Sequence, residues 1–276
     1  MNAAGIGSVG VIGLGKMGGQ LARHLAAAGF ETLGYDVRAE AMAQAEADGA
    51  AATGSPAALA SASDLVIVGV GFDSELEAAL FGRDGVMESP RPGSTIAVAS
   101  TVAPATMLKI AERIGDGDVA VLDIPMARGE QAAIDGNLLI FGGGDRAVFD
   151  RCRAAFATFS DSVHHLGPVG AGQVGKLVNN LILWACISAN EEGFRLAEEL
   201  GVESAPLREA LLRSSALNWA LATEAVERPM PWAEKDMTIV LKEADAARIS
   251  LPLSGTIKEV IKGVKIARGQ PMPEER

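Results

Sequence analysis

Residues 9–29 read VGVIGLGKMGGQLARHLAAAG and combine an apolar run, a glycine-rich turn and a helix-like segment. The turn has the pattern Gly13-x-Gly15-x-x-Gly18. Glycines at these positions allow a tight turn and let a pyrophosphate approach backbone N–H groups at the start of the following helix. The stretch therefore predicts a strand, a dinucleotide-binding loop and a helix, which is the beginning of a Rossmann-type fold.

The next apolar run, ETLGYD at residues 31–36, ends in an acid. An acid about 20 residues beyond the turn accepts hydrogen bonds from the adenosine ribose hydroxyls. Asp36 would also repel the 2′-phosphate of NADP, whereas Arg38 would stack on adenine or hold that phosphate. NAD is therefore the predicted cofactor, and NADP is the alternative. The competing interpretation is that no dinucleotide binds here, so that the glycines form a structural turn and Asp36 faces solvent. The predicted contacts are Gly13, Leu14, Gly15, Lys16, Met17, Gly18, Asp36 and Arg38.

The first 166 residues alternate short apolar runs with alanine-rich amphipathic segments, which is typical of a mainly parallel, doubly wound sheet. Strands rich in Val, Ile and Leu indicate burial on both faces of that sheet. The predicted strands lie at 9–12, 31–36, 64–70, 94–100, 118–123 and 137–143, and predicted helices include 17–28, 38–47 and 104–114.

Helical periodicity replaces the strand signals after residue 172, starting with a helix from about 173 to 200 that Gly201 ends. At 1.5 Å per residue this helix spans roughly 40 Å, longer than most globular helices. The sequence therefore predicts an α/β fold: a Rossmann-type doubly wound domain over residues 1–166, followed by an all-α C-terminal domain over 167–276, joined by the long helix.

Composition excludes several classes of function. The chain of 276 residues carries 24 Lys and Arg against 35 Asp and Glu, a formal charge of −11, which argues against nucleic acid as a partner. Two cysteines and three histidines cannot build a disulfide framework or a Cys/His metal cluster, so no metal is predicted. The N-terminus lacks the basic region of a signal peptide, and no segment reads as membrane-spanning, which predicts a cytoplasmic protein.

The segment GAGQVGKLVNN at residues 170–180 carries a second chemical signal. On a helix, Lys176 and Asn180 share a face and Asn179 lies beside them. Such a pair at a domain junction suits a proton donor and a substrate clamp, although an exposed lysine with two capping or packing amides fits the same spacing. Gly172 and Gly175 thin the first turn, so another backbone or a cofactor can come close.

Four ordered motifs now resemble one family. GLGKMG, DIP at 123–125, GAGQVGKLVNN at 170–180 and KDM at 235–237 are similar to motifs of the β-hydroxyacid dehydrogenases, which include 3-hydroxyisobutyrate dehydrogenases and tartronate semialdehyde reductases. The likeness runs from residue 8 to about residue 262. It implies hydride transfer between a nicotinamide and a small hydroxy acid, and assembly as a homodimer or homotetramer.

The resemblance also implies roles for individual residues. Lys176 matches the general acid/base at the substrate oxygen, and Asn180, with Asn179 beside it, matches the amide that orients the substrate. Lys235 matches a lysine near the nicotinamide end of the cofactor, and Thr101 matches a Ser/Thr near the nicotinamide ribose. Gly71 and Phe72 occupy a cofactor-lining loop that is often Leu-Pro in the family.

The loop LDIPMARGE, residues 122–130, departs from the family pattern Asp-x-Pro-Val-Ser-Gly-Gly. Ala127 removes the hydroxyl and Arg128 replaces the first glycine, while Gly129 keeps the second. A guanidinium is a rigid fork of donors suited to an oxyanion, so Arg128 and Gly129 are predicted to bind the anionic head of the substrate. The arginine resembles that of sulfolactaldehyde reductases, where it is associated with sulfonate. The alternative is that Arg128 pairs with Glu130 or Asp123.

The leading interpretation is an NAD-dependent dehydrogenase or semialdehyde reductase for a small anionic carboxylate or sulfonate. Imine reductases use the same scaffold but commonly carry Asp or Tyr where Lys176 stands, so the lysine argues against them. A dinucleotide-binding module without catalytic activity is the other alternative, and the intact Lys176–Asn180 pair argues against it.

Overall fold

The computed structural model describes residues 5–115, 117–223 and 230–271, which form two compact units. The first unit ends at Lys176 and the second begins at Leu177, so the division falls inside one continuous helix, α8 (Ala171–Glu199). The predicted boundary preceded this helix instead of lying within it. We describe each unit by itself.

Within the described residues, nine strands of the first unit form one sheet, in the order β3-β2-β1-β4-β5-β6-β8-β7 with β9 on the far side of β8. The strands from β3 to β6 are parallel, whereas β8 runs antiparallel to β6 and β7. The bounds are β1 Ser8–Ile12, β2 Glu31–Tyr35, β3 Ala51–Ala52, β4 Leu65–Val68, β5 Thr95–Val98, β6 Ala120–Asp123, β7 Met126–Ala127, β8 Leu138–Gly144 and β9 Ser160–Gly167.

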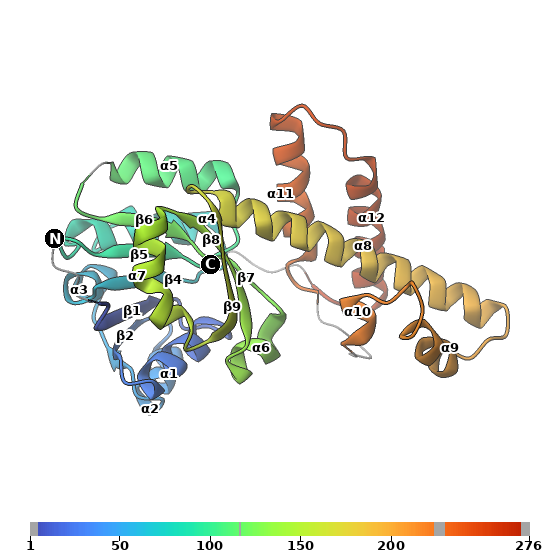
Figure 1. Cartoon of the computed structure of the whole chain (residues 1–276), viewed down its shortest axis with the longest axis horizontal. Coiled ribbons are helices and arrows are strands. Elements are labelled where there is room, and N and C mark those ends of the chain that lie inside the picture. Colours follow the sequence, from blue (N-terminus) through green and yellow to red (C-terminus); the bar gives the residue numbers. More distant parts are fainter. Residues whose placement is uncertain (1–4, 116, 224–229, 272–276) are drawn as a thin grey trace. The chain divides into compact units, whose positions relative to one another are not determined.

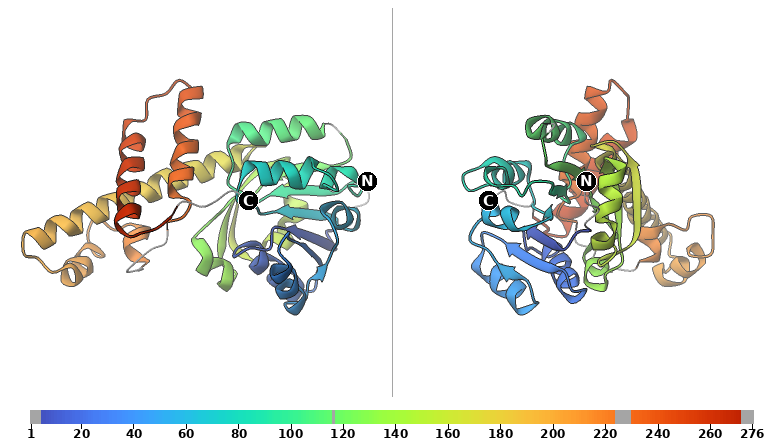
Figure 2. Two further views of the ribbon diagram at one scale, coloured as in Figure 1. Left: turned by 180° about the vertical axis from the view of Figure 1, so that it is seen from behind. Right: turned by 60° about the vertical axis from the view of Figure 1, so that its left-hand side comes forward.

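Helices cover both faces of this sheet, as Figure 1 and Figure 2 show. Successive residues of a strand point to opposite faces, so Leu65 and Ile67 join one core cluster while Val66 and Val68 join the other. The first cluster packs against α1, α2, α6 and α7, and the second against α3, α4 and α5. The helices are α1 Gly18–Ala27, α2 Ala39–Ala47, α3 Pro56–Ala62, α4 Asp73–Phe81, α5 Pro104–Ile114, α6 Gly129–Asp135 and α7 Arg146–Phe156, with a short η1 turn at Val86–Glu88.

The six predicted strands are confirmed, and each buried Val, Ile or Leu contributes roughly 1.5–3 kcal/mol to the stability of the sheet. Three strands were not predicted: β3, β7 and β9. β3 and β7 have two residues each, too few for a period to show. In β9, Asp161, Ser162 and two histidines interrupt the apolar alternation that identifies a strand.

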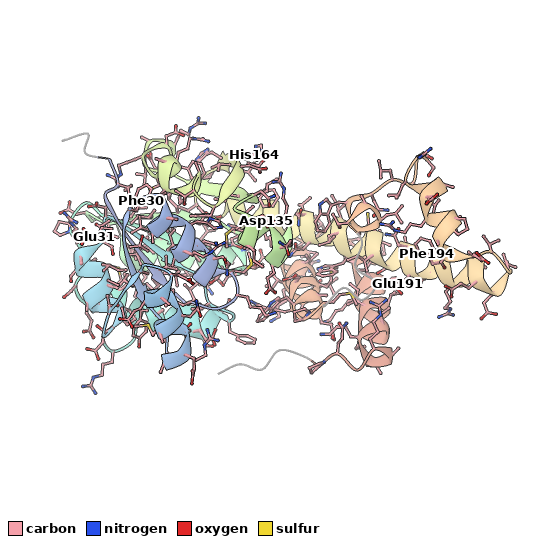
Figure 3. All side chains as sticks on the ribbon, turned by 90° about the horizontal axis from the view of Figure 1, so that it is seen from below. Phe30, Glu31, Asp135, His164, Glu191 and Phe194 are labelled. Atoms are coloured by element: carbon pink, nitrogen blue, oxygen red, sulfur yellow. The ribbon has the colours of Figure 1, made fainter. Side chains whose placement is uncertain are left out.

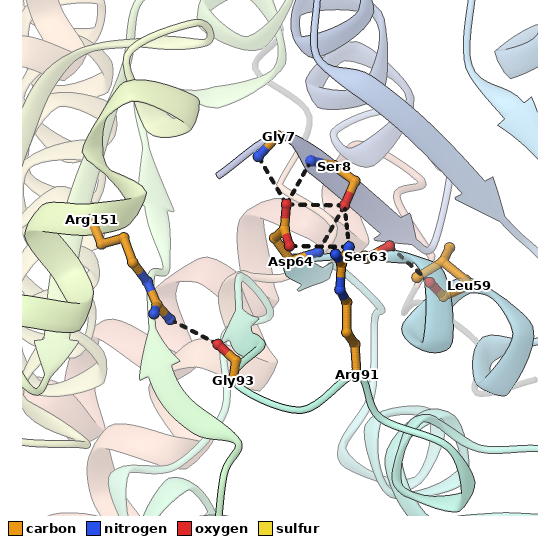
Figure 4. A network of polar contacts seen from close by, with 8 residues as sticks. All are labelled: Gly7, Ser8, Leu59, Ser63, Asp64, Arg91, Gly93 and Arg151. Atoms are coloured by element: carbon orange, nitrogen blue, oxygen red, sulfur yellow. Dashed lines mark hydrogen bonds and ion pairs between the residues drawn. The ribbon is translucent and has the colours of Figure 1, made fainter. Parts of the chain in front are cut away.

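Asp64 fastens the amino ends of β1 and β4 (Figure 4). Its carboxylate accepts from the N–H of Gly7 at 2.9 Å and of Ser8 at 3.0 Å, and it pairs with the Arg91 guanidinium at 3.1 Å. Burial raises the pKa of Asp64, but these donors outweigh it and leave the pKa below the ordinary value for aspartate. This clamp lies at the edge of the sheet opposite the glycine-rich turn.

Among its described residues, the second unit contains helices joined by turns and loops, and no strand. It contains most of α8 together with α9 Ser204–Leu211, α10 Trp219–Ala222, α11 Ala233–Ala246 and α12 Pro252–Ala267. Its core places Trp184 of α8 against apolar residues of α11 and α12. Glu191, labelled in Figure 3, pairs with Arg268 at 2.5 Å and so joins α8 to the end of α12.

Candidate active site

The glycine-rich turn after β1 has the geometry of a pyrophosphate cradle. Gly13 has a φ of +88°, and its N–H donates to the carbonyl of Tyr35 at 2.9 Å, which fixes the turn to β2. A Cβ at Gly18 would lie 1.9 Å from the carbonyl oxygen of Gly13, so a side chain cannot fit there. A Cβ at Gly15 would meet only Arg38 Nη2, at 3.7 Å, among the described residues. The turn is therefore tight inside and open above, as a bound dinucleotide requires.

Asp36 follows β2 and faces this turn. Its carboxylate accepts from the N–H of Leu14 at 2.8 Å, and it also accepts from Nε and Nη2 of Arg38, both at 2.9 Å. Burial raises the pKa of Asp36, but the hydrogen bonds from Arg38 and Leu14 outweigh it, so the pKa lies below the usual value. The sequence predicted both residues at this site but not the ion pair that joins them.

Lys16, inside the turn, contacts α6, the helix that follows the predicted substrate loop. Its ammonium donates to Glu130 of α6 at 2.9 Å. The other end of α6 is held by α1: Arg23 donates to the carbonyl of Ile134 at 2.6 Å, and His24 Nε2 lies 2.9 Å from the carbonyl oxygen of Ala133. The turn and α1 therefore hold α6 at both ends.

The loops after β4 and β5 contain the remaining predicted cofactor contacts of the first unit. Glu75 accepts from the N–H of Gly71 at 2.8 Å and of Phe72 at 3.1 Å, which shapes the first loop although the usual Leu-Pro is missing. Ser100 Oγ accepts from the N–H of Val70 at 2.8 Å and donates to its carbonyl at 2.9 Å. Half-buried Thr101 follows directly, so the two loops are tied together beside it.

Asp123 ends β6 and holds the start of α8. Its side chain is fully buried, and its two oxygens accept from the N–H of Gly170 at 2.7 Å and of Gln173 at 2.8 Å. Burial raises the pKa of Asp123, and these backbone donors offset the rise only in part. Asp123 is therefore the acceptor that the first turn of α8 needs.

Lys176 lies one turn into α8, and its ammonium donates to the carbonyl of Met126 at 2.6 Å. The glycines before it permit this approach. A Cβ at Gly172 would lie 2.5 Å from the carbonyl oxygen of Phe141, and a Cβ at Gly175 would lie 2.4 Å from Leu166. The prediction that another backbone comes close to the thinned helix is confirmed at Gly172, beside the backbone of β8, whereas the atoms close to Gly175 belong to side chains. The predicted acid/base thus contacts the predicted substrate loop.

Arg128 lies between β7 and α6 with a φ of +84°, a left-handed conformation that is rare for a side chain of this size. Gly129 follows with a φ of +81°. Arg128 Nη1 donates to the carbonyl of Asn137 at 2.7 Å and pairs with Asp161 of β9 at 2.5 Å. Among the described residues, its Nε and Nη2 have no hydrogen-bond partner.

The two partners suggested for Arg128 from the sequence are wrong. Glu130 binds Lys16, because its place in the first turn of α6 faces the glycine-rich turn. Asp123 instead accepts hydrogen bonds from backbone N–H groups at the start of α8. Asp161 comes near Arg128 only through the pairing of β8 with β9, and the sequence of β9 gives no strand signal that would indicate this pairing.

In the second unit, buried polar groups hold the predicted substrate amide. Asn180 Nδ2 donates to Asp236 Oδ2 at 2.9 Å, and Asn179 Nδ2 donates to Asn180 Oδ1 at 3.0 Å. Trp184 Nε1 also lies 3.4 Å from Asp236 Oδ2. A carboxylate only accepts, so Asp236 fixes which end of the Asn180 amide is the donor.

Lys235 precedes Asp236 on α11, and its ammonium lies 5.5 Å from the centre of the Trp232 ring. On the same turn, Glu234 pairs with Lys265 of α12 at 3.1 Å, and the Lys265 side chain is almost completely buried. The turn that carries the KDM motif is therefore anchored to both α8 and α12.

Comparison with known proteins identifies the fold at the level of family. The model of the NAD-binding domain of 6-phosphogluconate dehydrogenase matches residues 8–167. The model of the NAD-binding domain of NADP-dependent 3-hydroxyisobutyrate dehydrogenase matches residues 170–272. The chain belongs to the β-hydroxyacid dehydrogenase family.

Relatives in this family agree. The NAD-dependent L-serine dehydrogenase of Pseudomonas aeruginosa is 33% identical over 210 residues, 76% of this chain and 70% of that protein. The L-threonate dehydrogenase of Cupriavidus necator is 28% identical over 92% of this chain and 89% of that protein. The crystal structure of 3-hydroxyisobutyrate dehydrogenase from Salmonella typhimurium superimposes with a TM-score of 0.82 at 26% identity, covering 94% of each chain.

This β-hydroxyacid dehydrogenase is thus an NAD(P)-dependent oxidoreductase acting on CH–OH groups, with NAD or NADP as its cofactor. In the described part of the chain, no helix is long and apolar enough to cross a membrane. Nor do the described histidines, cysteines and acids gather into a group that would hold a metal ion.

Sequence reasoning missed the residues that position this dehydrogenase's site. Asp123 and Asp236 stand inside the quoted motifs DIP and KDM, and Gln173 stands inside GAGQVGK, so the motifs themselves were the available signal. Their roles depend on hydrogen bonds to residues about 50 or more positions away, which no local pattern encodes.

Proposed function

We propose that this dehydrogenase interconverts a small hydroxy acid with an anionic head and the corresponding aldehyde or ketone, with Lys176 as general acid/base. The observation that carries the proposal is the contact of the Lys176 ammonium with the carbonyl of Met126, at 2.6 Å. In this contact the lysine of GAGQVGKLVNN meets the loop that departs from the family pattern. The anionic head of the proposed substrate is a carboxylate or a sulfonate.

The first unit supplies the residues that would hold the cofactor. The open turn at Gly13–Gly18 accepts the pyrophosphate, Asp36 and Arg38 face the adenosine ribose, and the loops at Gly71 and Thr101 face the nicotinamide half. NAD(P) bound there supplies the group that accepts or gives the hydride.

The protein's part is to move a proton and to hold the substrate. In oxidation, the carbinol carbon loses a hydride while Lys176 Nζ, in its neutral form, takes the hydroxyl proton and the C=O bond forms. In reduction, the ammonium gives that proton back to the oxygen. The carbonyl of Met126 orients Nζ throughout. Asn180, whose amide is fixed by Asp236, would donate a hydrogen bond to the substrate.

The backbone of Arg128 supports a role in anion binding. A left-handed conformation at a non-glycine residue costs of order 1–3 kcal/mol, and strain of this kind concentrates at functional sites. A glycine would relax it, so the arginine is kept at a cost to stability. A guanidinium also gives the loop a local positive charge in a chain of net charge −11, which would otherwise repel an anionic substrate.

Lys176→Ala tests the acid/base assignment. We expect kcat to fall by roughly two to four orders of magnitude, the usual worth of a positioned acid/base, while the Kd for NAD stays unchanged. Lys109→Ala, which removes an exposed lysine of α5, is the control and should leave both values unchanged. Near-normal turnover of Lys176→Ala at saturating substrate would overturn the mechanism. Suitable substrates to screen are 3-hydroxyisobutyrate, glycerate, threonate, 4-hydroxybutyrate and dihydroxypropanesulfonate.

Two variants with opposite expected effects on kcat/KM test the proposed anion site. Arg128→Gly should lower kcat/KM roughly 10- to 150-fold, the worth of a charged hydrogen bond, with a larger loss on a sulfonate than on a monocarboxylate. Its Tm should not fall, because the backbone strain is relieved. Asp161→Asn weakens the competitor for the guanidinium and should raise kcat/KM on the same substrates. Small, equal losses on both substrate types would leave Arg128 outside the substrate site.

Oligomeric state stays a prediction. Sedimentation velocity of the purified chain would distinguish a homodimer or homotetramer from a monomer.

A further inference from the structure

Gln173 lies in the first turn of α8, three residues before Lys176, and its side chain is fully buried. Its Nε2 donates to the carbonyl of Ser100 at 2.8 Å, and its Oε1 accepts from the N–H of Val102 at 3.2 Å. The two peptide groups that it binds lie on either side of Thr101. The side-chain amide therefore pairs with this segment as a neighbouring strand would, and it holds the backbone on both sides of one residue.

The same residue is part of a longer hydrogen-bond network within the first unit. The Gln173 backbone N–H donates to Asp123 at the end of β6. Ser100, after β5, is bonded through its hydroxyl to both backbone groups of Val70, after β4. The carboxyl ends of three adjacent strands are thus connected to the helix that carries Lys176, and Gln173 is the link between the loops and the helix.

We propose that Gln173 is a positioning residue that fixes Thr101, and with it the nicotinamide half of the cofactor site, relative to Lys176. The proposal rests on the proposed function, in which Thr101 contacts the nicotinamide ribose. Hydride transfer and proton transfer act on the carbon and the oxygen of one bond, so the two loops must keep their spacing to the lysine within a fraction of an ångström.

The chemistry of an amide suits this role better than that of other side chains of its size. It provides a donor and an acceptor in one plane, as the peptide segment requires. Methionine at the same position would fill the space and leave the Ser100 carbonyl and the Val102 N–H unpaired in a buried place. We expect the loop to move toward other partners, taking Thr101 with it.

Cofactor binding gives a test that does not depend on the substrate. NAD carries the nicotinamide ribose, whereas ADP carries only the adenosine and the pyrophosphate. By calorimetry, Gln173→Met should weaken NAD binding roughly tenfold, as expected for the loss of buried hydrogen bonds that hold a contact residue, and leave ADP binding within twofold of wild type. Equal losses for NAD and ADP, or no loss for either, would overturn the proposal.

Ser63→Ala is the matched control. Ser63 is fully buried and donates to the carbonyl of Leu59 at 2.8 Å, but it lies at the opposite edge of the sheet (Figure 4). This variant also loses a buried hydrogen bond, so its Tm should fall, while its affinities for NAD and ADP should both stay at the wild-type value. A drop in NAD affinity here would show that any buried defect produces the effect.

Gln173→Glu keeps the proposal testable if the methionine variant does not fold. A protonated carboxyl presents one acceptor and one donor, as the amide does, whereas the ionised form cannot donate to Ser100. We therefore expect NAD affinity, relative to wild type at each pH, to recover as the pH falls from 8 to 6. Asp123 faces this turn from the end of β6 and Lys176 follows it on α8, so the affinity of the variant is compared with that of wild type at each pH to account for these two groups. If the NAD affinity of Gln173→Glu divided by that of wild type does not change with pH, the proposal is contradicted.

These measurements separate the inference from the proposed function. If Lys176→Ala keeps its turnover, the acid/base assignment fails while the binding result for Gln173→Met stands. If Gln173→Met binds NAD normally and Lys176→Ala is inactive, only the positioning role of Gln173 fails.

Discussion

Asp36 and Asp123 stand at the same carboxyl edge of one parallel sheet, just after β2 and at the end of β6, yet their surroundings differ. Asp36 accepts from a guanidinium as well as from backbone N–H groups, and its pKa is lowered despite burial. Asp123 accepts from backbone N–H groups of α8, and burial raises its pKa.

The difference lies in the partner. The backbone donors to Asp123 offset its full burial only in part, whereas the less deeply buried Asp36 also accepts from a guanidinium. The Arg38 side chain is 41% exposed, so it can turn from Asp36 toward a ligand. The donors to Asp123 are backbone N–H groups at the start of α8 and directly before it, so they stay in place. The first aspartate is therefore suited to binding and the second to holding the fold.

Removing the second carboxylate should have the largest effect. Asp123→Ala leaves the N–H groups of Gly170 and Gln173 buried without this acceptor, at about 1–3 kcal/mol each, so the free energy of unfolding should fall by about 2–6 kcal/mol in urea titrations. Asp145→Ala is the control, because Asp145 caps α7 from an exposed position and accepts from Val148 at 2.9 Å. That variant should lose only about 1 kcal/mol. If both variants lose the same free energy of unfolding, the buried Asp123 stabilises the fold no more than the exposed Asp145 does.

Removing the first charge should change cofactor choice instead of stability. Asp36→Asn releases Arg38 and ends the repulsion of a 2′-phosphate, so the ratio of kcat/KM for NADP to that for NAD should rise about 10- to 100-fold, or about 1.4–2.8 kcal/mol. Arg38→Ala should move the ratio in the opposite direction. A wild-type enzyme that already prefers NADP would mean that Arg38 dominates at this end of β2.

The smallest effect concerns acid stability, where the two aspartates should act with opposite signs. The pKa of Asp36 is lowered by folding, so its contribution to stability is present above the unfolded pKa and is lost as the pH falls through the folded pKa. The pKa of Asp123 is raised, so its contribution is fully present below the unfolded pKa and is lost as the pH rises through the folded pKa. Tm measured from pH 3 to pH 7 should therefore fall less steeply at its acid end in Asp36→Asn than in wild type. If Tm falls equally steeply at the acid end in Asp36→Asn and in wild type, the lowered pKa of Asp36 is contradicted.

This contrast also marks what one sequence can predict. Six strands of the first unit, the glycine-rich turn and the place of Asp36 follow from patterns within about 30 residues, because periodicity and turn chemistry are local. Lys176 was found through its motif. The ion pair of Asp36 with Arg38 depends on rotamers, and the role of Asp123 depends on a helix that starts 48 residues later. The left-handed backbone at Arg128 had one signal, the glycine that the family pattern places there.

The left-handed backbone at Arg128 also bears on how this loop can evolve. The path of the loop is set by β7 before it and α6 after it, and glycine adopts the same conformation without strain. Every arginine codon differs from a glycine codon by a single nucleotide. A lineage can therefore exchange a charged loop for a neutral one in a single mutation without adding backbone strain, and under the proposed anion site this exchange would change which anions the enzyme accepts.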